Sequence, residues 1–99
     1  MAELIIQKER KRDDLRIIVE AWKIRESDEF PHGIKYSYQA YRIGDGETLL
    51  RYDNHNIHAG SRDHKHVEGE AEKLGLTPKN SEGLQKLFRR FMDELDEIR

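Results

Sequence analysis

Four of the five histidines in this chain lie close together, at His55, His58, His64 and His66. The other charged side chains of this segment are those of Asp53, Arg62, Asp63 and Lys65. Imidazole gains and loses a proton near neutral pH, and it is also the commonest metal ligand. A hydrophobic core would not favour so polar a segment, because every buried polar group needs a partner. We therefore expect this segment to transfer protons, bind a metal ion or bind phosphate.

The spacing of these residues indicates which of them work together. His64 and His66 are two positions apart, so both rings project to the same face of an extended strand. On a helix the two rings would diverge by about 200°. His55 and His58 are three apart and meet only on a turn. Asp53 ends an expected strand, where a carboxylate can fix the tautomer and orientation of an imidazole.

In a first interpretation, the histidines form a general acid–base site that acts on a phosphodiester. One imidazole takes a proton from the attacking ribose hydroxyl, and another gives one to the leaving oxygen. Lys65 or Arg62 stabilises the charge of the phosphorane. Such a site needs no cofactor. Further candidate substrate contacts are Lys35, Tyr36, Tyr52 and Asn54.

A second interpretation is a metal site, and a third is a passive polar loop. His64 and His66, an aspartate such as Asp63, and either His55 or His58 offer ligands that zinc, nickel and iron accept. In the third interpretation the histidines only hydrogen-bond to the backbone. The residue types leave these alternatives open, and none of them calls for an organic cofactor.

The elements that position this segment begin with an expected hairpin. Residues 4–10 and 15–24 are rich in strand-forming side chains and flank the turn-forming pair Asp13-Asp14. Residues 15–24 are apolar on both faces, which is typical of a central strand, and we expect Trp22 in the core.

Two further strands are expected at residues 35–43 and 47–53. They flank Gly44-Asp45-Gly46, in which the glycines can adopt the positive φ of a tight hairpin loop. Short connections between successive strands predict antiparallel pairing with sequence neighbours. We therefore expect a four-stranded antiparallel meander.

The C-terminal third of the chain predicts helices. Residues 54–70 show no clear period, and residues 70–74 favour a short helix that ends at Gly75. The last segment is apolar at every third or fourth position, which predicts an amphipathic helix about 27 Å long on one face of the sheet. The fold class is therefore α+β. The apolar stripe consists of Leu84, Leu87, Phe88, Phe91, Met92, Leu95 and Ile98.

The composition limits the classes of protein to which the chain can belong. Its 99 residues fit a single domain, 1–99. The absence of cysteine excludes disulfides, thiolate catalysis and thiolate zinc sites. With 18 Lys and Arg against 20 Asp and Glu, it lacks the basic composition of a general nucleic-acid binder. No apolar run approaches the ~20 residues of a membrane span. The early charges argue against a signal peptide, so we expect a cytoplasmic protein with no membrane partner.

The order of several motifs resembles one known family. In chain order the motifs are His32–Ser37, Leu50–Asn54, Asp63–His66 and a C-terminal helix with Leu84, Leu87 and Phe91. Together they resemble the TumE-type toxin family, small proteins regarded as the toxin half of prokaryotic toxin–antitoxin pairs. The resemblance covers most of the chain. It implies a toxic protein that a cognate antitoxin counteracts.

Small toxins commonly attack RNA, and this analogy makes RNA the expected substrate. We expect a metal-independent ribonuclease with His64 and His66 as its acid–base pair, Asp53 as the orienting residue and Lys65 on the phosphate. The alternative is a non-catalytic binding module that uses the His-rich segment for a metal ion or for a protein or nucleic-acid partner. Because a four-stranded sheet has two open edges, we also expect a homodimer.

Overall fold

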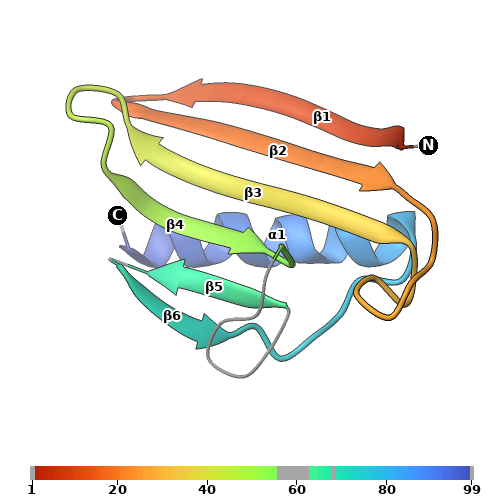
Figure 1. The fold of residues 1–99 in the computed structure, drawn as a ribbon. Coiled ribbons are helices and arrows are strands. Elements are labelled where there is room, and N and C mark those ends of the chain that lie inside the picture. The colour runs from red at the N-terminus through yellow and green to blue at the C-terminus, as the bar shows by residue number, and fades with distance from the viewer. Residues whose placement is uncertain (1, 56–62, 68, 99) are drawn as a thin grey trace.

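The fold is a single antiparallel sheet with one long helix against it (Figure 1). The computed structural model describes residues 2–55, 63–67 and 69–98. Each strand pairs with the next one in the chain, so the sheet order is β1-β2-β3-β4-β5-β6. The elements are β1 (Glu3–Arg12), β2 (Leu15–Lys23), β3 (Ile34–Arg42), β4 (Thr48–Asp53), β5 (His64–Val67), β6 (Glu70–Lys73) and α1 (Ser81–Ile98).

The expected fold class is confirmed, but the expected number of strands is wrong. The sheet has six strands rather than four, and the expected short helix at residues 70–74 is instead strand β6. β5 and β6 have four residues each and little apolar alternation, so their sequences alone do not favour strands. Pairing with β4 creates β5, and Gly69, with φ of 87°, allows the tight connection into β6.

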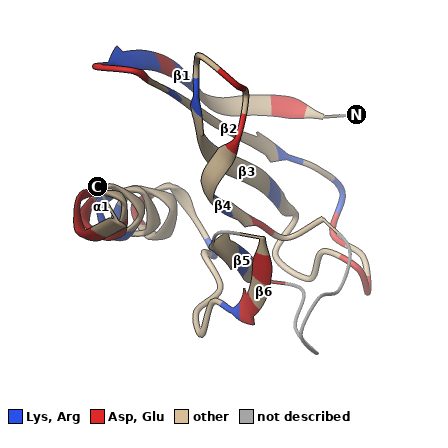
Figure 2. Ribbon diagram, turned by 90° about the vertical axis from the view of Figure 1, so that its left-hand side faces the viewer, with Lys and Arg blue, Asp and Glu red and all other residues tan. Residues whose placement is uncertain are grey.

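The helix lies on one side of the sheet only (Figure 2). We call that side the helix face and the other side the open face. Strand residues alternate between the two faces. The open face of the four inner strands carries Arg16, Ile18, Glu20 and Trp22 of β2, Lys35, Ser37, Gln39 and Tyr41 of β3, Arg51 and Asp53 of β4, and His64 and His66 of β5.

Alternation along β2 explains why Trp22 is not in the core. Ile17, Val19 and Ala21 are buried on the helix face, whereas Trp22 lies on the open face across from Lys35 and is only half-buried. Both faces of β2 are apolar in sequence, and the single helix decides which of them becomes the core. The expectation that Trp22 is a core residue is therefore wrong.

The helix is held by aromatic packing and by a cap. Asn80 accepts a hydrogen bond of 2.9 Å from the Gly83 amide, which satisfies one free N–H of the first turn. The Phe91 ring meets those of Tyr38 and Tyr52 edge-on, with centroids 6.0 and 5.0 Å apart. These contacts fix the position of α1 over β3 and β4. Among the described residues, no helix combines the length and apolarity needed to cross a membrane.

Candidate functional site

The pairing of β4 with β5 assembles a polar cluster on the open face. Asp53 lies across from His64, and Arg51 lies across from His66. The His64 and His66 rings project to the same face, as their spacing predicts, and meet edge-on with centroids 5.0 Å apart. The short strand β5 therefore brings both imidazoles beside the end of β4.

Asp53 is the centre of this cluster. One carboxylate oxygen lies 2.9 Å from Nε2 of His64, and the other lies 2.7 Å from Nε of Arg51. The His55 amide donates a hydrogen bond of 3.3 Å to Oδ1. Asp53 is 3% exposed and His64 is fully buried. A buried carboxylate in this position has the geometry of a group that can orient the adjacent imidazole.

Access to solvent differs sharply between the two histidines. His66 is half-buried, and with Arg51, Thr48 and Gly69 it lines a hollow of about 230 Å³. The His64 ring contacts that of His66 but has no exposed surface. A ligand that enters this hollow meets an imidazole and a guanidinium, which suit a phosphate group.

Lys65 lies on the other side of the sheet. Its Nζ is 2.7 Å from a carboxylate oxygen of Glu94 in α1, and the Tyr52 hydroxyl donates a short hydrogen bond to the same carboxylate. Burial, followed by Glu94, raises the pKa of Tyr52 above its usual range. The structure therefore separates Lys65 and Tyr52 from the two histidines.

Tyr36 and Asp63 form another network away from the histidine pair. The Tyr36 hydroxyl donates a hydrogen bond of 2.8 Å to Asp63, and the Thr77 hydroxyl donates one of 2.7 Å to the same carboxylate. Burial, followed by Asp63, raises the pKa of Tyr36. These contacts tie β3 to the segment that leads into α1.

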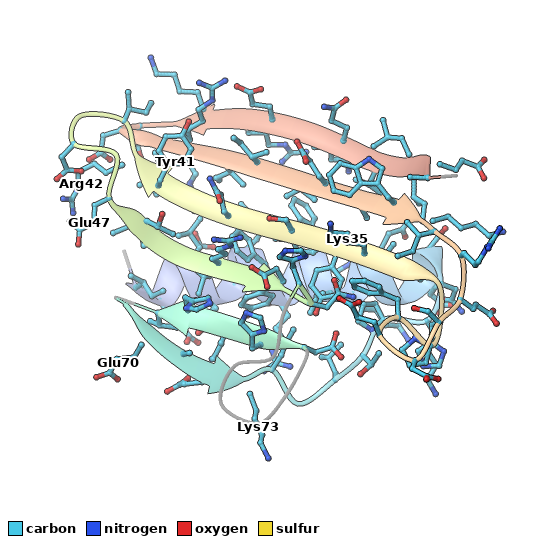
Figure 3. The ribbon with its side chains drawn as sticks, viewed as in Figure 1. Lys35, Tyr41, Arg42, Glu47, Glu70 and Lys73 are labelled. Atoms are coloured by element: carbon cyan, nitrogen blue, oxygen red, sulfur yellow. The ribbon has the colours of Figure 1, made fainter. Side chains whose placement is uncertain are left out.

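Two other candidate residues that the structure describes, Asn54 and Lys35, lie in different places. Asn54 bridges backbone groups, because its side chain accepts from the Tyr36 amide at 3.0 Å and donates to the Ile34 carbonyl at 2.8 Å. Lys35 is on the open face, two residues along β3 from Ser37, which pairs with Asp53 (Figure 3). His58 and Arg62 lie outside the residues that the structure describes.

The same cluster has the composition of a metal site. One ligand atom each from Asp53, His64 and His66 lies within 4.8 Å of the others. Two imidazoles and a carboxylate are a ligand set that divalent transition metals accept. The carboxylate in this position belongs to Asp53 and not to Asp63, which the sequence suggested.

Comparison with known proteins decides the family. The family model described as Toxin TumE matches residues 3–99. The chain belongs to the TumE toxin family. Membership implies that it is the toxin of a toxin–antitoxin pair and that its partner is an antitoxin. Searches of curated proteins and of solved structures gave no significant match.

Strand alternation gives the three consecutive residues of the Tyr52-Asp53-Asn54 motif different surroundings. Tyr52 faces the helix, Asp53 faces the histidines, and Asn54 fastens the end of β3. Sequence reasoning missed Arg51 as a candidate site residue. The spacing could have identified it, because Arg51 precedes Asp53 by two residues on a strand and its side chain must therefore lie on the same face.

Proposed function

We propose that this toxin cleaves RNA at the cluster of Asp53, His64, His66 and Arg51, without a metal ion. One observation carries the proposal: a buried aspartate–histidine pair lies against a second, accessible histidine that shares a hollow with an arginine. Family membership supports toxicity, and the hollow supports a phosphate-containing target.

The proposed reaction is an internal transesterification. The ribose 2′-oxygen attacks the adjacent phosphorus, and the bond from phosphorus to the 5′-oxygen breaks. His66 takes the proton of the 2′-hydroxyl. The departing 5′-oxygen lies on the opposite side of the phosphorus and takes a proton from a solvent water, and His66 then returns its own proton to the solvent. The Arg51 guanidinium offsets the added negative charge of the phosphorane. The products are a 2′,3′-cyclic phosphate and a 5′-hydroxyl.

Two roles differ from those expected from sequence. His64 is buried, so we assign it as a positioning residue that transmits the orientation set by Asp53 to His66. Arg51 replaces Lys65 as the phosphate contact, because Lys65 is paired with Glu94 on the helix face.

Cleavage of single-stranded RNA by the purified protein in excess chelator tests this proposal. His66→Ala should lower kcat by about 10²–10⁴-fold, the usual contribution of one positioned acid or base. Asp53→Asn should lower kcat with little change in KM when both proteins are assayed well below their unfolding temperatures, which separates positioning from loss of folded protein. Arg89→Ala, on the exposed side of α1, is the control for losing one cation. Full activity of His66→Ala would refute the mechanism.

The ligand geometry favours one second candidate, a site that binds a divalent metal ion. In that case Asp53, His64 and His66 would each supply one ligand atom. Zinc titration by calorimetry would then show one site per chain, and Asp53→Ala would abolish it. RNA cleavage that is lost in chelator and restored by a divalent ion would favour this candidate over the acid–base mechanism.

A further inference from the structure

A second and larger hollow lies beside the first, where the end of β1, the start of β2 and the end of β3 come together. Its volume is about 600 Å³. It is distinct from the hollow at His66, and neither the family match nor the acid–base cluster assigns it a role. Its lining residues are Glu9, Arg10, Lys11, Arg16, Tyr41 and Ile43.

The lining combines an aromatic ring, an exposed aliphatic side chain and several cations. Tyr41 is half-buried, and Ile43 is 44% exposed, which is unusual for so apolar a residue. Figure 3 shows the Tyr41 side chain extending from the end of β3 across the neighbouring strand β2. An aromatic face beside guanidinium groups is the arrangement by which proteins bind an unpaired base and its phosphate.

One residue pair places the two hollows side by side. Tyr41 on β3 lies directly across from Thr48 on β4, and Thr48 lines the hollow that contains His66 and Arg51. Directly paired strand residues have Cβ atoms about 5 Å apart. A nucleic-acid strand that crosses β3 and β4 can therefore occupy both hollows at once.

We propose that the larger hollow binds one nucleotide of single-stranded RNA next to the bond that is cleaved. This inference rests on the proposed ribonuclease function and names its substrate class. Tyr41 stacks on the base, and Arg16 binds the phosphate. A duplex is excluded because its bases already stack on one another, so none is free to lie on Tyr41.

In the structure, a carboxylate already occupies the position in which Arg16 would bind the phosphate, and this provides a test. Its guanidinium forms an ion pair with Glu9, whose carboxylate also lines the hollow. RNA must displace or share this carboxylate. Glu9→Gln should therefore tighten RNA binding, whereas Arg16→Ala should weaken it.

The experiment measures binding rather than cleavage. The His66→Ala protein is titrated into a short fluorescein-labelled RNA, single-stranded or duplex, and anisotropy gives the dissociation constant. Adding Tyr41→Ala should weaken single-strand binding about 5- to 150-fold, the range for loss of one stacked base, and Tyr41→Phe should retain it. Arg89→Ala is the charge-matched control, and it should weaken binding less than Arg16→Ala.

The outcomes separate this inference from the proposed function. Equal binding by the parent and Tyr41→Ala, equal losses from Arg16→Ala and Arg89→Ala, or tighter binding of duplex would each overturn the nucleotide site. If His66→Ala still cleaves RNA while Tyr41→Ala weakens binding, the assigned mechanism fails and the nucleotide site stands.

Discussion

Phe91 is the residue through which the helix is most clearly bound to the sheet. Its ring is fully buried and meets Tyr38 and Tyr52 edge-on. Phe91→Ala removes a buried aromatic side chain and should lower the free energy of unfolding by about 3–5 kcal/mol. Phe91→Leu keeps most of the volume but loses both ring pairs. At about 0.5–1.5 kcal/mol per pair, it should lower the free energy of unfolding by about 1–3 kcal/mol.

Equilibrium unfolding in urea measures both effects, provided that the slope of unfolding free energy against urea concentration is unchanged. Lys86→Ala is a control on the same helix, because the Lys86 side chain is 70% exposed. It should change the free energy of unfolding by less than about 0.5 kcal/mol. A loss below about 1 kcal/mol for Phe91→Ala would mean that α1 does not pack on the core of the sheet.

Three further predictions concern burial, the helix face and assembly. Burial raises the pKa values of Tyr36, Tyr38 and Tyr52, so the free energy of unfolding should fall as the pH rises above ~10, where these tyrosines ionise in the unfolded chain. Urea unfolding at increasing pH measures this loss, and a constant free energy of unfolding up to pH ~11 would contradict it. Lys65→Met should lower the free energy of unfolding by about 1–3 kcal/mol, measured in urea, yet leave RNA cleavage unchanged, because Lys65 binds Glu94. The expected homodimer remains a prediction, and a light-scattering mass of 11.8 kDa would contradict it.

The elements with a strong local pattern could be predicted from the sequence. The spacing of Leu84, Leu87, Phe91 and Leu95 predicts α1, and all four are buried in the structure. The Asp13-Asp14 turn predicts the first hairpin, and Asp13 adopts the positive φ of 55° that aspartate tolerates. In both cases the signal lies within a few consecutive residues.

The parts that could not be predicted depend on contacts between distant residues. β5 and β6 become strands because the edge of β4 is available for pairing, and their own sequences do not predict strands. Which face of β2 is covered depends on the helix, so the position of Trp22 was not determined locally. At the site, alternation correctly placed His64 with His66. The same rule places Arg51 on the face of the two histidines and Lys65 on the helix face, and it could have been applied to the sequence.

Growth inhibition by His66→Ala shows whether toxicity depends on the accessible histidine of the open face. We expect the parent toxin to arrest growth when expressed without its antitoxin, whereas His66→Ala should not when it accumulates to the same level. His32→Ala, an exposed histidine in the loop before β3, is the matched control and should arrest growth like the parent. Growth arrest by His66→Ala equal to that of the parent would show that toxicity does not arise from the open-face cluster.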